Sequence, residues 1–283
     1  MFGFLPNNLF TAHRAQNTTG LSPRLWGRVT GSMMSSSGDK RLVLIGDDFL
    51  AMNHLATTYA NVNSEVGYTA VIDAGGTITQ LVDEKGGVIA LTTDGTDEDE
   101  IWIAAGDGTG HLGMISDTAA DAHLTAFECR FKISSITDAV MSMFVGLAAP
   151  GSAAVEFVVD ATGALKATTQ LIGFRTLLDG DLISFVWQAV ADSAVVIGIS
   201  SAKVPVADTF MKLGFVYDPE APAAKRITVY ADNVELSTYV TATQIAAATF
   251  PDAEALTFRA AQKQIGATAG ELALDWWAFG QLV

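Results

Sequence analysis

The segment that decides the fold class is residues 127–133, Phe-Glu-Cys-Arg-Phe-Lys-Ile, with an apolar residue at every odd position and a charged one at every even position. Successive side chains of a β-strand point to opposite faces, so this alternation predicts a strand with one face on a core and one in water. The alternation returns at 183–187, 213–217 and 272–276, with turn sequences between such segments. The chain is therefore predicted to be an all-β protein, an antiparallel β-sandwich.

The domain organisation follows from where this pattern starts. Strand-like segments begin at Arg41, and no Pro- or Ser-rich linker follows, so residues 41–283 are predicted to form one sandwich. The two segments that read as short helices are 241–249 and 253–264. The hairpin turn near the C-terminal end is expected at Asp232-Asn233.

Residues 1–40 differ from the rest in charge and pattern. Four basic side chains against one acidic one give this segment +3, and the whole chain carries −15, so residues 41–283 carry −18. The segment lacks sustained periodicity, yet it holds several large apolar side chains. It is predicted to be an arm that orders by docking on a partner, with a flexible tail as the alternative. The predicted contact residues of the arm are Phe2, Phe4, Leu5, Phe10, Arg14, Arg24, Trp26 and Arg28.

Composition excludes several classes of function. The acidic net charge argues against nucleic acid as a partner, since phosphate binding needs clustered Lys and Arg. No apolar run is long enough for a membrane-spanning helix, and no secretory signal is expected at the start. The single cysteine, Cys129, lies on the apolar side of its strand and is expected to pack in the core.

The order of several motifs resembles a known fold family. An Asp47-Asp48-Phe49 opening precedes a Gly-Gly turn and apolar strand (86–92), an acidic loop (93–100), the 127–133 strand, a late hairpin (226–233) and a closing Leu-Asp-Trp-Trp (274–277). This order resembles the concanavalin A-like (laminin G/glucanase-type) jelly roll, particularly the versions in virion proteins of tailed bacteriophages. The late hairpin of that family commonly reads Val-Tyr-Val-Asp-Gly, and Ala231 and Asn233 depart from it.

No catalytic set and no metal or cofactor site is predicted. Hydrolases of this fold resemble one another in a Glu-x-Asp-x-x-Glu strand motif, but Glu98 has no Asp two residues later. The acidic loop also lacks the spacing of a calcium loop and is expected to be solvated, with calcium binding as the alternative. The four histidines have no metal-ligand spacing; they are His13, His54, His111 and His123.

Adjacent tryptophans give a last expectation. Trp276 and Trp277 point to opposite faces of one strand, so one of them lies outside the core. Coverage of that indole by the arm or by a neighbouring subunit is expected, because large exposed apolar groups mark contact surfaces.

The resemblance implies a non-enzymatic capsid decoration (cement) protein on the virion surface, assembled in the host cytoplasm. Its implied partners are the major capsid protein and other copies of the chain, with a trimer as one form of the homo-oligomer. Two alternatives stay open: a carbohydrate-binding module of a tail fibre or adhesin, and a divergent glycan hydrolase or lyase.

Overall fold

The computed structural model describes residues 20–35, 41–49, 67–73, 75–84, 87–106, 112–118, 121–137, 140–150, 157–158, 165, 169–177, 180–189 and 195–283. Its helices are α1 (Pro23–Ser35) and α2 (Ala242–Ile245). Its strands are β1 (Leu42–Asp47), β2 (Tyr68–Ile72), β3 (Thr77–Gln80), β4 (Ile89–Thr92), β5 (Glu100–Ala105), β6 (Gly113–Ile115), β7 (Leu124–Ile133), β8 (Met141–Ala148), β9 (Leu171–Leu177), β10 (Gly180–Gln188), β11 (Val196–Lys203), β12 (Met211–Tyr217), β13 (Ile227–Ala231), β14 (Val234–Val240), β15 (Glu254–Gln264) and β16 (Glu271–Leu282).

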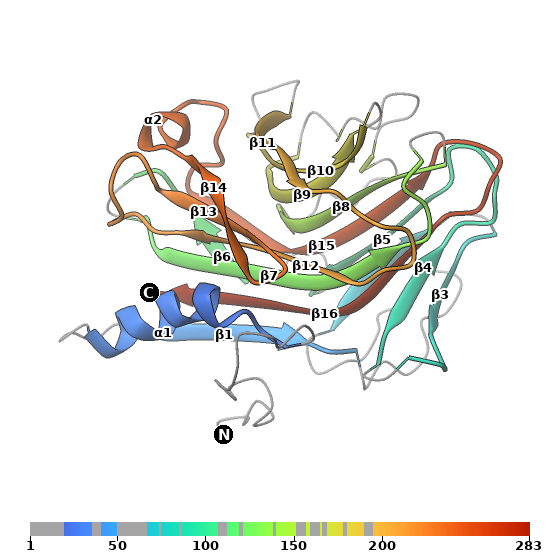
Figure 1. The fold of residues 1–283 in the computed structure, drawn as a ribbon, viewed down its shortest axis with the longest axis horizontal. Helices are drawn as coiled ribbons and strands as arrows, with labels where there is room; N and C mark the ends of the chain where they lie inside the picture. The colour runs from blue at the N-terminus through green and yellow to red at the C-terminus, as the bar shows by residue number, and fades with distance from the viewer. Residues whose placement is uncertain are drawn as a thin grey trace.

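Two antiparallel sheets lie face to face and confirm the predicted sandwich (Figure 1). The first sheet has the order β14-β13-β12-β7-β16-β4-β3, and β1 also pairs with β16. The second sheet has the order β11-β10-β9-β8-β15-β5-β2, and β6 also pairs with β15. Strands distant in sequence are neighbours in both sheets, as in a jelly roll.

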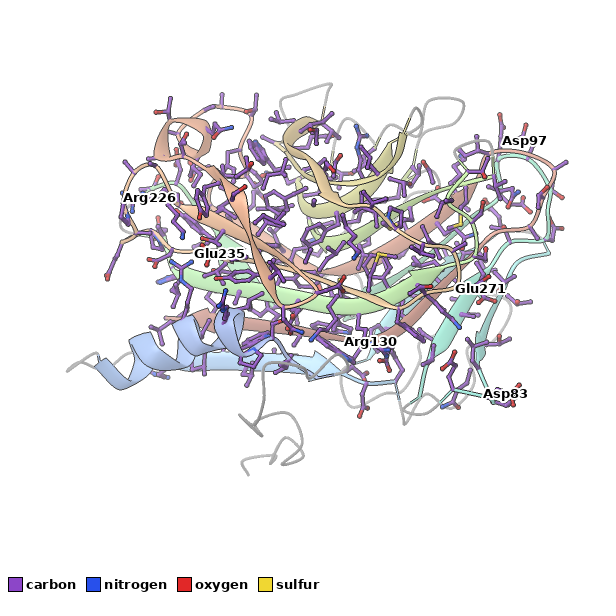
Figure 2. The ribbon with its side chains drawn as sticks, viewed as in Figure 1. Asp83, Asp97, Arg130, Arg226, Glu235 and Glu271 are labelled. Carbon is purple, nitrogen blue, oxygen red and sulfur yellow. The ribbon has the colours of Figure 1, made fainter. Side chains whose placement is uncertain are left out.

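The core lies between the sheets and uses the alternation of the opening segment. Phe127, Cys129 and Phe131 are fully buried there. Trp277 stacks on Phe258 with ring centroids 4.6 Å apart, and the indole N–H of Trp277 donates to the Tyr68 hydroxyl at 2.7 Å. Figure 2 shows side chains filling the space between the sheets, with Asp83 and Asp97 towards one end of the sandwich and Arg226 at the other.

Two of the predicted local features hold. The turn at Asp232 and Asn233 joins β13 to β14, and both residues have positive φ (47° and 71°), as a tight hairpin turn requires. Within 241–249, residues 242–245 form α2. Thr241 caps this helix in a capping box with Gln244.

The helix predicted at 253–264 is wrong, because this segment is β15. Its alanines favour a helix in isolation, but the segment lies in the middle of the second sheet, paired with β8 on one side and with β5 and β6 on the other. Burial of both faces decides its structure: Phe258 faces the core, while Arg259 and Ala261 are buried on the outer face.

Candidate functional site

Helix α1 lies against the outer face of the first sheet, beside β1 (Figure 1). The side chains of Leu25, Trp26 and Val29 are at most 6% exposed, which places one face of the helix on the sheet. They form a second apolar cluster with residues of β7, β12, β13 and β16. Its members are Leu21, Leu25, Trp26, Val29, Leu124, Ala126, Val216, Tyr230, Ala278 and Leu282. Burial of each large apolar side chain contributes about 1.5–3 kcal/mol to this docking.

A buried carboxylate fixes the start of the helix. Glu128 of β7 is 1% exposed and accepts hydrogen bonds from the Ser22 amide (2.9 Å), the Ser22 hydroxyl and the Trp26 indole N–H (2.8 Å). Lys212 donates to the Gly20 carbonyl at 2.6 Å, and this bond holds the chain two residues before Ser22. Burial raises the pKa of Glu128, while the bonds from Ser22 and the charge of Lys212 oppose this shift. The prediction that this charged position faces water is wrong, because α1 covers it.

Two glycines make room for the helix. A Cβ at Gly214 of β12 would lie 2.6 Å from Cδ1 of Leu25, and a Cβ at Gly280 of β16 would lie 2.8 Å from Cζ3 of Trp26. Both distances are shorter than carbon–carbon contacts allow. The sheet surface is therefore shaped to receive these two side chains.

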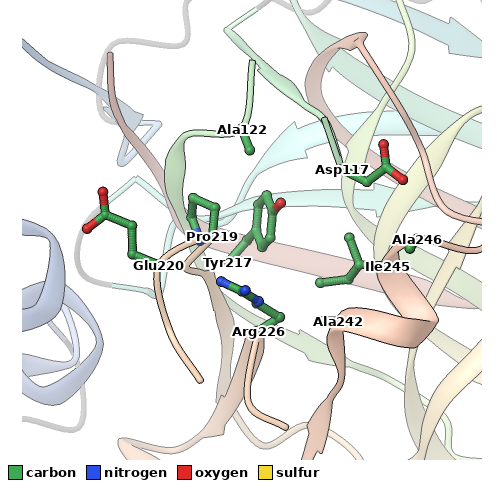
Figure 3. A pocket seen from close by; sticks show the side chains of 9 residues that line it. All are labelled: Asp117, Ala122, Tyr217, Pro219, Glu220, Arg226, Ala242, Ile245 and Ala246. Atoms are coloured by element: carbon green, nitrogen blue, oxygen red, sulfur yellow. The ribbon is translucent and has the colours of Figure 1, made fainter. Parts of the chain in front are cut away.

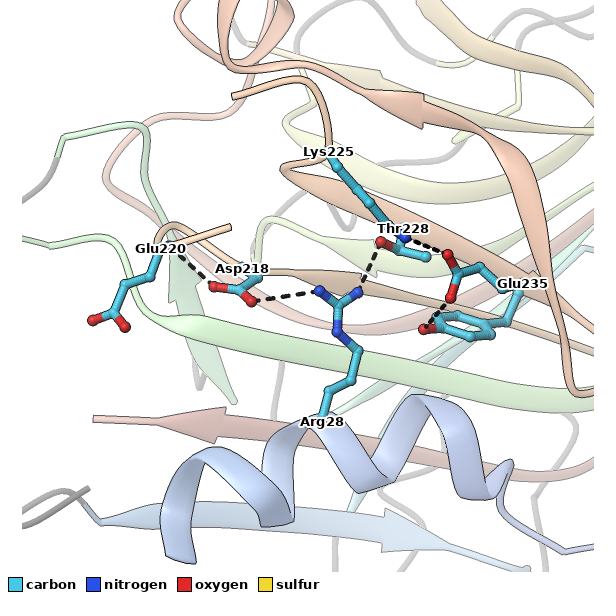
Figure 4. Close-up of polar contacts among 7 residues, drawn as sticks. Arg28, Asp218, Glu220, Lys225, Thr228 and Glu235 are labelled. Carbon is cyan, nitrogen blue, oxygen red and sulfur yellow. Dashed lines mark hydrogen bonds and ion pairs between the residues drawn. The ribbon is translucent and has the colours of Figure 1, made fainter. Parts of the chain in front are cut away.

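An arginine in the middle of α1 contacts β13 and the residue that follows β12 (Figure 4). Arg28 donates to the Thr228 hydroxyl at 2.8 Å and lies 3.5 Å from the Asp218 carboxylate. Both side chains of this ion pair are about a quarter exposed, so the pair orients the helix more than it stabilises the fold.

The structure places part of the predicted arm. Trp26 and Arg28 have partners within their own chain, and Arg24 is exposed on α1. The other predicted contact residues lie outside the described residues: Phe2, Phe4, Leu5, Phe10 and Arg14. The interface role of all these residues stays a prediction, and the contacts of α1 cross the predicted boundary at residue 40.

One tryptophan of the pair lies outside the core, as expected, and its cover by the arm stays a prediction. Trp277 is in the core, and Trp276, partly buried on the opposite face, packs against the cluster that α1 forms with the first sheet. The cluster that it packs against belongs to the same chain.

The acidic loop is solvated as predicted over Asp94, Asp97 and Glu98, which are exposed. Glu100 at its end is different. It is buried on the outer face of the second sheet, where its Oε1 accepts hydrogen bonds from the amides of Phe157 (2.9 Å) and Val158 (3.2 Å). Burial raises the pKa of Glu100 to about 7, opposed by these two bonds and by the charge of Lys263.

A buried arginine lies next to this carboxylate. The guanidinium of Arg259 lies 4.5 Å from the ring centre of Trp102 and 4.9 Å from that of Phe157, and the side chain is fully buried. Burial lowers its pKa to about 10, with the Glu100 charge opposing. Among the described residues, no group of three His, Cys, Asp or Glu side chains is arranged to hold a metal ion.

Two adjoining pockets form a groove at one end of the sandwich, called here the end groove. One pocket, of about 380 Å³, is lined by Asp117, Ala122, Tyr217, Pro219, Glu220, Arg226, Ala242, Ile245 and Ala246 (Figure 3). The other, of about 270 Å³, is lined by Ala122, His123, Leu124, Asp218, Pro219, Glu220, Leu282 and Val283. Ala122, Pro219 and Glu220 line both, so the two pockets adjoin.

The end groove has polar groups of both signs. Nη1 of Arg226 is buried and has no hydrogen-bond partner among the described residues. The Tyr217 hydroxyl donates to the Ser116 carbonyl at 2.8 Å, and burial raises the pKa of Tyr217 to about 12. Burial and a hydrogen bond with Asp252 raise the pKa of Asp117. None of these residues was singled out from the sequence as a site, because four distant segments line the groove: 117–124, 217–226, 242–246 and 282–283.

The fold is the concanavalin A-like jelly roll. A protein of unknown function from Shewanella oneidensis MR-1 superposes with a TM-score of 0.52 at 14% identity, covering 93% of this chain and 95% of that one. The basic winged bean lectin, in complex with Tn-antigen, superposes with a TM-score of 0.50 at 10% identity, covering 86% of this chain and 99% of the lectin. At these identities the likeness concerns the fold alone.

Sequence comparisons add no closer relationship. No protein-family model matches the chain, and no curated protein matches it. In the described part of the chain, no helix is long and apolar enough to cross a membrane.

Proposed function

We propose that this chain is a non-enzymatic capsid decoration protein of a tailed bacteriophage, which binds the shell and neighbouring copies through its leading segment. The observation that carries the proposal is the fixed anchor of that segment. Glu128 and the two glycine notches hold Ser22–Val29 on the first sheet, so residues 1–19 start from a defined point of the sandwich. Those residues contain Phe2, Phe4, Phe10 and Arg14 and no acidic side chain.

An anchored segment suits a decoration protein for a physical reason. Ordering a peptide on a partner costs conformational entropy, and a fixed starting point reduces the volume that its free end explores. Many equivalent copies on one particle then add modest individual affinities into stable occupancy. In this proposal the major capsid protein and other copies of the chain are the partners, and the virion surface is the location.

The ionisable side chains support a binding role over catalysis. The carboxyl of Glu100 has a pKa raised to about 7, but it is 2% exposed and accepts hydrogen bonds from the amides of Phe157 and Val158. The sequence also lacks the paired carboxylate motif by which glycan hydrolases of this fold resemble one another.

The test removes residues 1–19 and keeps α1. Deleting all of residues 1–40 would strip the cover from the apolar cluster of the first sheet and confuse loss of binding with loss of folding. Particles assembled without this protein are incubated with the full chain or with the shortened chain and then sedimented. We expect the full chain to sediment with the particles and the shortened chain to stay in solution. Equal occupancy by the two chains, or saturable binding to a glycan array with no particle binding, would contradict the proposal.

A further inference from the structure

We propose that, while no partner is bound, the leading segment docks in the end groove of its own chain as an extended peptide, with Phe2 in one of the two pockets and Phe4 in the other. This inference concerns where the segment binds and does not require the partner to be a virus particle. It rests on the shape, the charge and the position of the groove.

The groove offers two adjoining pockets, which is the number that two alternate side chains of a strand would need. Residues i and i+2 of an extended chain point to the same side and lie roughly 7 Å apart. The two pockets adjoin across Pro219 and Glu220, with volumes of about 380 Å³ and 270 Å³. Phe2 and Phe4 have this spacing, and an aromatic ring buries a large apolar area for few lost rotamers. Apolar contacts are available from residues that line the pockets: Ala122, Leu124, Pro219, Ile245 and Leu282.

The polar groups of the groove suit a peptide backbone and a basic side chain. Nη1 of Arg226, buried and without a hydrogen-bond partner among the described residues, can donate to a carbonyl of a bound strand. Asp117, Asp218 and Glu220 line the groove, and the guanidinium groups of Arg226 and of Arg28, which pairs with Asp218, offset two of these three carboxylates and leave one negative charge. Residues 1–19 carry Arg14 and no acidic side chain, which is the complementary charge.

The leading segment is long enough to reach. Gly20 is held by Lys212 near the start of β12, and the groove begins at Tyr217, the last residue of the same strand. Five residues of strand span about 17 Å. The 14 residues between Leu5 and Gly20 extend up to about 46–50 Å, so the path around the end of the sheet is within their length.

The experiment places a photo-crosslinking phenylalanine analogue at position 4 of the full chain and maps its cross-links by mass spectrometry. We expect cross-links to residues 117–124, 217–226 and 282–283. Ala122 lines both pockets, so Ala122→Trp should fill them and abolish these cross-links, and Glu220→Arg should weaken them by reversing the charge. Ala223→Trp, an exposed position in the same loop that lines neither pocket, is the matched control and should keep them.

Circular dichroism and thermal denaturation of each variant show that the fold is kept. Cross-links elsewhere on the chain, or cross-links that persist at full yield in both Ala122→Trp and Glu220→Arg, would overturn the inference. The outcome is separate from the particle test: a segment can dock in the groove in a protein that binds no particle, and a particle-binding segment can leave the groove empty.

Discussion

The carboxyl group of Glu100 provides a quantitative test of the outer face of the second sheet. Its pKa rises from an ordinary 4.5 to about 7 because the side chain is buried. A carboxyl with a raised pKa in the folded state binds its proton more tightly there than in the unfolded chain. Its stabilising contribution is therefore complete below pH 4.5 and is lost as the pH rises to about 7.

The magnitude follows from the size of the shift. The rise from 4.5 to about 7 corresponds to about 3 kcal/mol, since each pKa unit is worth about 1.36 kcal/mol. Glu100→Gln keeps an oxygen that accepts from the Phe157 and Val158 amides and cannot ionise. We expect this variant to match the parent at pH 4.5 and to exceed it in unfolding free energy by about 3 kcal/mol at pH 8.

The assay is urea denaturation of both chains at a series of pH values between 4.5 and 8. Taking the difference between them removes the titration of other groups, including Asp99, whose pKa is raised to about 6. Glu98→Gln, an exposed position two residues earlier, is the control and should follow the parent throughout. A Glu100→Gln curve parallel to that of the parent would show that burial does not raise the pKa of Glu100.

Three further outcomes test the docking of α1 and the core. Gly280→Ala should displace Trp26 from the sheet and lower the free energy of unfolding by about 1–3 kcal/mol. Hydrogen exchange of the α1 amides should become faster, and unchanged exchange would show that Trp26 does not pack against Gly280. Arg28→Ala should cost no more than about 1 kcal/mol in chemical denaturation, since its ion pair with Asp218 is partly exposed. Cys129, fully buried with a thiol pKa raised by that burial, should react with a thiol reagent only after unfolding, and rapid labelling of the native chain would show that the core is open.

The sequence predicts the sandwich because strand alternation is a local property. Phe127, Cys129 and Phe131 face the core as their spacing requires, and the hairpin at Asp232-Asn233 follows from turn chemistry. What covers the outer face of a strand is not local, so Glu128 and Glu100 were expected in water and are buried.

Helix α1 and the end groove were not predicted, because both depend on contacts between segments that are distant in sequence. The apolar face of α1 rests on Leu25, Trp26 and Val29, little more than one turn, and Gly27 between them lowers helix propensity. Its stability comes from the sheet beneath, which the local pattern does not contain. The groove joins residues near 120, 220 and 245, which only the folded chain brings together.

We propose that the sandwich holds α1 on its own first sheet and that its leading segment binds a partner on a virus head. Cryo-electron microscopy of particles that carry this chain tests it most directly. We expect copies in symmetric positions on the head, with α1 on the first sheet of its own chain and residues 1–19 touching the shell or an adjacent copy. Copies confined to the tail, or no copies on the particle, would contradict it.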